Sequence, residues 1–162
     1  IYSHKVEYDN TRDIKAKKTI TVIKDFANKP LNELKALEIG CYKGEISYLL
    51  SKYFKSYHAI DIDKKAINIA YNNYKAENLT FKVENAEELN FSDSLFDVVI
   101  CSHVYEHVPF PKKMMDEIHR VLTSDGFCYF AAGNKLKKKE QNVGKNHKTE
   151  LKIYGTINFK KV

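Results

Sequence analysis

The sequence predicts a doubly wound α/β fold, a mostly parallel sheet with helices on both faces. Short apolar segments typical of buried strands alternate along the chain with segments whose apolar residues recur at helical spacing. The segment Phe96 to Cys101 is apolar almost throughout, as expected for a parallel strand covered on both faces. In such sheets ligands bind at the carboxyl ends of the strands.

Four of the expected elements have a boundary signal. Pro30 ends the first helix, because proline disfavours helical backbone in the residue before it. Asp63 suits the N-cap of the helix after the second strand, and Pro111 suits the first turn of the last helix. Asp125 and Gly126 are expected to turn the chain into the last core strand. The expected helices are 11–29, 45–54, 64–74 and 111–122, and the expected strands are 36–39, 57–62, 80–84, 96–101 and 127–132.

Length and composition indicate one globular domain over residues 1–162, and the motif-bearing part of this domain is about 35–132. A chain of 162 residues with 43% hydrophobic residues can bury a core without disulfides or metals. The tail 133–162 is expected to form a polar loop and one or two short strands. No apolar run approaches the roughly 20 residues of a membrane span, and no secretory signal opens the chain, so a cytoplasmic location is expected. Three dispersed cysteines are expected to be reduced core thiols: Cys41, Cys101 and Cys128.

The chain is basic, with a net charge of +6 and a pI near 9.0. Acidic residues are interleaved with the basic ones for most of its length, which favours a solvated surface over an anion track. One compact lysine run, at 135–139, leaves a nucleic-acid partner open as an alternative.

The segment Leu37 to Gly44 predicts a ligand site. A strand ends there and a helix begins, through a turn bounded by Gly40 and Gly44, where a ligand can approach the backbone closely. Asp61 ends the next strand, 21 residues after Gly40, and suits the two hydroxyls of a ribose. Tyr42 stands where a dinucleotide site needs its central glycine. We therefore expect a nucleoside ligand without a pyrophosphate.

These segments resemble the class I S-adenosylmethionine-dependent methyltransferases, the methyltransferase type 11 domain. The resemblance covers about residues 35 to 132, and Tyr42 and Asn85 depart from the family's usual glycine and aspartate. It implies S-adenosylmethionine as cofactor, S-adenosylhomocysteine as product and a small-molecule methyl acceptor. It also implies cofactor contacts at Glu38, Gly40, Cys41, Gly44, Asp61, Ile62, Asn85, Ala86, Cys101 and Ser102. The segments that carry it are 37–44, 59–63, 83–89, 96–108 and 120–126.

The segment His103 to His107 (HVYEH) leaves several readings open. It resembles the H-x-x-E-H motif of zinc peptidases, but that motif needs a long helix, whereas this segment follows a strand and precedes Pro109. It also resembles a metal-binding segment of ubiquinone-type O-methyltransferases. No metal is assigned, and His103 is the candidate base or acceptor-orienting group. A non-catalytic nucleoside-binding module and an RNA methyltransferase remain the alternative functions.

Overall fold

The computed structural model describes residues 11–132 and 153–157 of the chain. The helices are α1 (Thr11–Phe26), the 3-10 turn η1 (Leu31–Glu33), α2 (Glu45–Ser51), α3 (Lys64–Asn73) and α4 (Pro111–Val121). The strands are β1 (Lys35–Ile39), β2 (Ser56–Asp61), β3 (Leu79–Val83), β4 (Phe96–Ser102), β5 (Leu122–Ala132) and β6 (Ile153–Ile157). No helix in these two ranges is long and apolar enough to cross a membrane.

The strands form one sheet in the order β3-β2-β1-β4-β5-β6. The first five are parallel and β6 pairs antiparallel with β5. The predicted fold class is therefore confirmed, and the strand order reverses between β1 and β4. Because β1 and β4 lead away in opposite directions from this point, the space above their carboxyl ends is open to a ligand.

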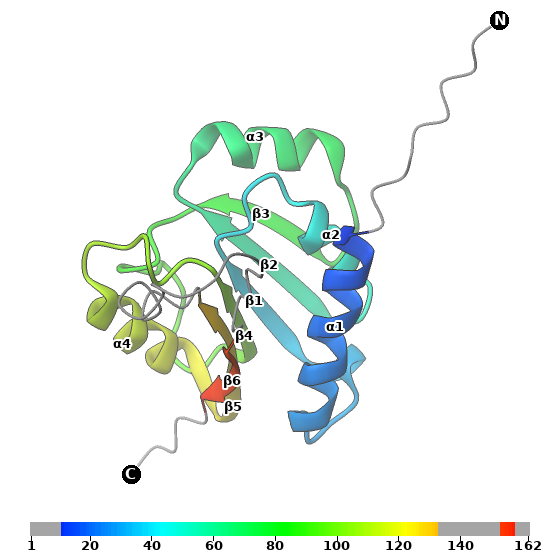
Figure 1. The fold of residues 1–162 in the computed structure, drawn as a ribbon, viewed down its shortest axis with the longest axis vertical. Coiled ribbons are helices and arrows are strands. Elements are labelled where there is room, and N and C mark those ends of the chain that lie inside the picture. Colours follow the sequence, from blue (N-terminus) through cyan, green and yellow to red (C-terminus); the bar gives the residue numbers. More distant parts are fainter. Residues whose placement is uncertain (1–10, 133–152, 158–162) are drawn as a thin grey trace, which may run out of the picture.

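Two cores cover the two faces of the sheet. Helices α1, α2 and α3 lie on one side and α4 on the other (Figure 1). Residues alternate along each strand, so Ala36 packs with the α1 side and Leu37 with the α4 side. Glu38 is in phase with Ala36 and therefore faces α1 and α2. This alternation gives the carboxyl end of β1 a buried acid on the α1 side.

Most expected elements are present, with three clear differences at their ends. Helix α1 ends at Phe26, three residues before the expected end at residue 29. Helix α2 stops at Ser51 and not at residue 54, because the Asn78 amide donates to the carbonyls of Ser51 and Phe54, both at 2.8 Å. Strand β5 begins at Leu122, so the expectation that Asp125 and Gly126 turn the chain into the strand was wrong. Leu122 already pairs with Phe96, and the register then shifts so that Val98 pairs with Phe127. Asp125 and Gly126 therefore lie in an irregularity inside the strand.

Most of the tail lies outside the described residues, including the lysine run at 135–139. Within it only β6 is described, a single short strand where one or two were expected.

Candidate functional site

The turn after β1 is fixed by backbone bonds to β2. The amides of Gly40 and Cys41 both donate to the Ile60 carbonyl, at 2.8 and 3.0 Å. Gly40 and Gly44 have left-handed backbone, with φ of 81° and 78°. A Cβ at Gly40 would lie 2.3 Å from Cγ2 of Val104, which belongs to the loop after β4. Glycine is therefore required here both by the backbone conformation and by the close approach of that loop.

Asp61, at the end of β2, holds the same turn. Its Oδ2 accepts from the Tyr42 amide at 2.8 Å, and its Oδ1 accepts from the Asp63 amide at 2.9 Å. Tyr42 has a φ of 49°, a conformation that glycine adopts more easily, and its side chain is 52% exposed. The hydrogen bond to the Asp61 carboxylate thus offsets part of the backbone strain at Tyr42, where the family that this chain resembles carries glycine.

A cavity of about 350 Å³ opens at this edge of the sheet. It lies between the turn after β1, the carboxyl end of β4 and one face of α1. Five of its lining residues were predicted from the sequence: Glu38, Gly40, Cys41, Gly44 and Ser102. The lining residues from α1 are Arg12, Lys15 and Thr19.

Glu38 is a buried acid at this cavity, 8% exposed. Its carboxylate accepts from the Tyr57 hydroxyl at 3.0 Å. Burial raises the pKa of Glu38 above its ordinary value, while Ser47, Tyr57 and the charge of Lys15 oppose the rise. The buried Ser47 hydroxyl has no hydrogen bond of ordinary geometry with any described residue, although it lies near enough to lower this pKa. The region therefore has unused capacity to accept hydrogen bonds from a cationic group.

The ends of β2 and β3 lie beside this cavity and do not line it. Val83, which pairs with Asp61 at the end of β3, and Ile62, which follows Asp61, are 45% and 73% exposed. Asn85 accepts from the Glu87 amide at 3.0 Å through its side chain, and Ala86 is buried. The predicted contacts Asp61, Ile62, Asn85 and Ala86 thus follow two adjacent strands, next to an exposed apolar surface.

The residues after β4 point in different directions. The Cys101 side chain is fully buried in the core on the α4 side, so only its backbone can face the cavity that Ser102 lines. His103 has left-handed backbone with a φ of 59°, and its amide donates to the Ala131 carbonyl at 2.7 Å. Its Nδ1 lies 3.5 Å from Oε1 of Glu106. The segment 103–110 is not helical, which agrees with the rejection of a zinc-peptidase motif.

Nothing in the described part of the chain gathers three His, Cys, Asp or Glu side chains into a metal-binding group. The metal-assisted reading of His103, Glu106 and His107 therefore gains no support from the geometry.

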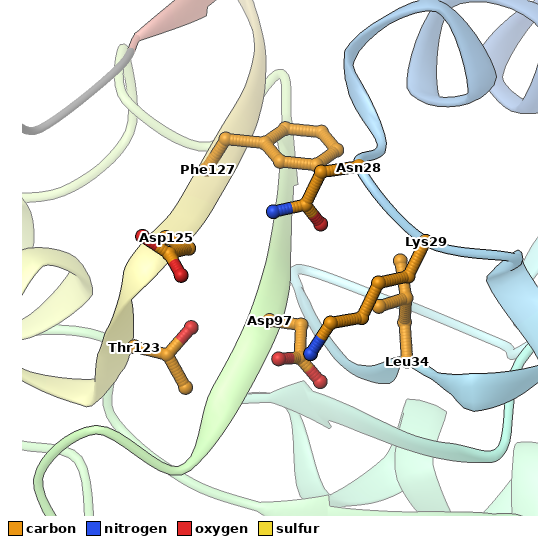
Figure 2. A pocket seen from close by; sticks show the side chains of 7 residues that line it. All are labelled: Asn28, Lys29, Leu34, Asp97, Thr123, Asp125 and Phe127. Atoms are coloured by element: carbon orange, nitrogen blue, oxygen red, sulfur yellow. The ribbon is translucent and has the colours of Figure 1, made fainter.

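A smaller cavity of about 160 Å³ lies at the opposite, amino end of the strands. Figure 2 shows Asp97 and Asp125 at its wall together with Lys29, Phe127 and others. Asp97 already accepts from the Lys35 amide at 2.9 Å, which ties β4 to the start of β1. We assign this cavity no ligand, because ligand sites of doubly wound sheets lie at the carboxyl ends of the strands.

Among the lining residues that the sequence did not predict are three from α1. From the sequence, the apolar residues of this helix predict only that it covers the sheet, and its polar residues predict an ordinary solvent-exposed surface. Arg12, Lys15 and Thr19 are spaced three and four apart, so they share a face. That this face borders a cavity depends on the docking of α1 beside α2, which the local sequence does not encode.

Two curated relatives match well over half of this chain. A ubiquinone biosynthesis O-methyltransferase of Pelagibacter ubique is 32% identical over 123 residues, 72% of this chain and 51% of the relative. A protein of the same name from Coxiella burnetii is 26% identical over 101 residues, 61% of this chain and 43% of the relative. The chain thus spans about half the length of these curated relatives.

The solved structure of the YcgJ protein of Bacillus subtilis superposes with a TM-score of 0.65 at 25% identity, covering 72% of this chain and 51% of that one. The sequence pattern described as "Methyltransferase domain" matches residues 37–130, from the strand before the glycine turn almost to the end of β5. The predicted family is confirmed: the chain belongs to the methyltransferase domain family of the class I, S-adenosylmethionine-dependent type.

Proposed function

We propose that this chain binds S-adenosylmethionine at the carboxyl edge of β1, β2 and β3 and transfers its methyl group to an oxygen of a small molecule. The observation that carries the proposal is the cavity at the glycine turn, with the buried Glu38 carboxylate beside it and Asp61 at the end of the next strand. The names of the relatives, O-methyltransferases of ubiquinone biosynthesis, support oxygen as the acceptor atom.

The groups at this edge fit the cofactor part by part. Glu38 and the nearby Ser47 hydroxyl can accept hydrogen bonds from an ammonium group. Each Asp61 oxygen accepts one backbone hydrogen bond and keeps a further lone pair for a ribose hydroxyl. The exposed side chains of Ile62 and Val83 offer an apolar surface to a flat base. The donor and acceptor set therefore matches an adenosine joined to an amino acid.

Bound S-adenosylmethionine supplies a methyl group on a positively charged sulfur, ready for in-line displacement. The work of the protein is mainly to hold the two reactants close and aligned, which can supply most of the rate. The amides of Tyr42 and His103, both in left-handed turns, donate to the Asp61 carboxylate and to the Ala131 carbonyl, and these bonds tie the two turns to β2 and β5. His103 is 40% exposed and can accept the proton of an acceptor hydroxyl.

Calorimetry with S-adenosylhomocysteine tests the binding step. Asp61→Ala should weaken binding by about tenfold or more, because it removes charge-assisted hydrogen bonds. Asp116→Ala is the matched control, since Asp116 pairs with Lys112 on the exposed face of α4 and lies outside the candidate site, and it should leave binding unchanged. Absence of binding by the folded wild-type chain would overturn the proposal, and equal binding by Asp61→Ala would remove Asp61 from the site.

Methyl-labelled S-adenosylmethionine tests the transfer step. Label should pass from the cofactor to a small-molecule fraction of a cell extract, on an oxygen identified by NMR of the product. Label recovered only in RNA would favour an RNA methyltransferase, the alternative that the lysine run at 135–139 suggests. Tight binding without transfer to any fraction would favour a non-catalytic nucleoside-binding module.

A further inference from the structure

The charges of this chain are divided between its two halves. Residues 11–78 carry 13 lysines and arginines against 8 acidic residues, whereas residues 79–132 carry 4 against 9. Helices α1, α2 and α3 belong to the basic half and lie on one side of the sheet, and α4 belongs to the acidic half and lies on the other side (Figure 1). The helices on one side of the sheet therefore attract anionic partners.

Lysines and tyrosines of these three helices lie in contact with one another. The Nζ of Lys24, on α1, is 5.8 Å from the centre of the Tyr53 ring, which follows α2. The Nζ of Lys52, at the end of α2, is 4.6 Å from the centre of the Tyr48 ring. Tyr48 in turn packs against Tyr74, at the end of α3, with ring centres 5.4 Å apart. These contacts connect the three helices through rings and cations.

The contacts continue along α3. The Nζ of Lys75 is 5.9 Å from the centre of the Tyr71 ring, and Tyr71 is 62% exposed. Residues three apart in a helix are neighbours on its surface, so Tyr71 and Tyr74 lie on the same side of α3. The residues that make up this basic-aromatic surface are Lys24, Tyr48, Lys52, Tyr53, Tyr71, Tyr74 and Lys75.

The lysines of the basic-aromatic surface differ from the cations of α4 in their partners. No acid in the described part of the chain lies within salt-bridge distance of Lys24, Lys52 or Lys75. On α4, by contrast, Lys112 and Arg120 are both paired with acids. The charges of the basic-aromatic surface are therefore available to an external anion.

We propose that the basic-aromatic surface binds single-stranded nucleic acid. Proteins that bind single strands combine cations, which contact the phosphates, with aromatic rings, on which the bases stack. A lysine that leaves its ring for a phosphate exposes the face of that ring to a base. An anionic lipid surface would attract the same charges, but it offers no flat bases to the rings. The proposal goes beyond the proposed function and does not depend on it, because none of these residues lines the cofactor cavity.

Fluorescence anisotropy with a labelled single-stranded RNA of about 15 nucleotides tests the proposal on the full chain. Tyr71→Ala should weaken binding by about tenfold, the effect of losing one stacked base, whereas Tyr71→Phe keeps the ring and should bind as the wild type does. Combined Lys24→Gln, Lys52→Gln and Lys75→Gln substitutions should make the slope of log K against log salt shallower by about 2. Duplex RNA should bind more weakly, because its bases are paired and cannot stack on the rings.

Lys112→Gln combined with Lys113→Gln is the matched control, since both lysines are exposed on α4, and it should leave RNA binding unchanged. Every variant should unfold cooperatively in urea, and Tyr71→Ala should bind S-adenosylhomocysteine as the wild type does. Absence of RNA binding, or RNA binding that Tyr71→Ala and the combined lysine variant leave unchanged, would overturn the proposal. Binding to phosphatidylglycerol vesicles and not to RNA would also overturn it and would assign the surface to an anionic membrane.

Discussion

Gly40→Ala tests the geometry of the turn after β1. The new Cβ would lie 2.3 Å from Cγ2 of Val104, and the residue would keep a φ of 81°. A left-handed non-glycine residue costs about 1 to 2 kcal/mol, and forced overpacking costs about 1 to 3 kcal/mol. We expect urea unfolding to show a loss of about 2 to 5 kcal/mol in the free energy of unfolding, the sum of these two effects.

A double-mutant cycle separates the two contributions. In Val104→Ala the offending Cγ2 is gone, and the nearest remaining side-chain atom, Cβ, would lie 3.7 Å from the new methyl group, an ordinary contact. Val104→Ala alone should cost about 1 kcal/mol, because Val104 is only partly buried. The double variant should then be more stable than the sum of the single effects predicts by about 1 to 3 kcal/mol, the overpacking energy.

Gly126→Ala is the control for this cycle. Gly126 has no left-handed backbone, and a Cβ there would come no closer than 3.0 Å to a neighbour, so we expect a loss of about 1 kcal/mol. Additive effects of Gly40→Ala and Val104→Ala, within about 0.5 kcal/mol, would refute the contact between the turn and the loop after β4.

Further predictions concern the buried acid Glu38, the buried thiols and the hydrogen bonds of Arg120. Burial raises the pKa of Glu38 in the folded chain above its ordinary value of about 4.3. Ionised Glu38 therefore destabilises the fold at a pH above the raised pKa, and this effect is absent at a pH below the ordinary value. Glu38→Gln should therefore increase urea resistance by about 1 kcal/mol at neutral pH and not near pH 4, while it weakens binding of S-adenosylhomocysteine. Burial also raises the pKa of Cys101 to about 12, and thiol reagents at about pH 8 should label it only as the chain unfolds. Cys41 lies at the cavity wall, so it should react more slowly with S-adenosylhomocysteine present than without it. Arg120→Lys should lower the free energy of unfolding by about 1 to 2 kcal/mol in urea, because lysine cannot reproduce the paired bonds to Glu117 and to the Phe91 carbonyl; an unchanged value would contradict this role.

Local signals were enough to predict most of the fold. Asp63 was expected to cap α3 from residue type and position alone, and its side chain does accept from the amides of Lys65 and Ala66. The apolar run of β4 indicated a strand covered on both faces, and Val98 and Val99 are indeed buried in different cores. These features succeed because each depends on neighbours within a few residues.

The features that sequence could not provide depend on distant contacts. The end of α2 is set by Asn78, whose amide binds carbonyls 24 and 27 residues away. The start of β5 is set by pairing of Leu122 with Phe96. The contribution of α1 to the cavity wall depends on how that helix packs against the rest of the domain. In each case a local pattern is compatible with several outcomes, and tertiary packing selects one.

Two of the three non-glycine residues with left-handed backbone in the described part of the chain lie at the edge where the motifs also gather. The described non-glycine residues with left-handed backbone are Tyr42, Ser94 and His103. Tyr42 and His103 lie on the turns that follow β1 and β4, the two strands between which the sheet order reverses. Each is held by a hydrogen bond from its amide, to the Asp61 carboxylate or to the Ala131 carbonyl. Strain that surrounding strands maintain in this way is typical of binding and catalytic sites, so the backbone points to the same edge of the sheet as the side-chain chemistry.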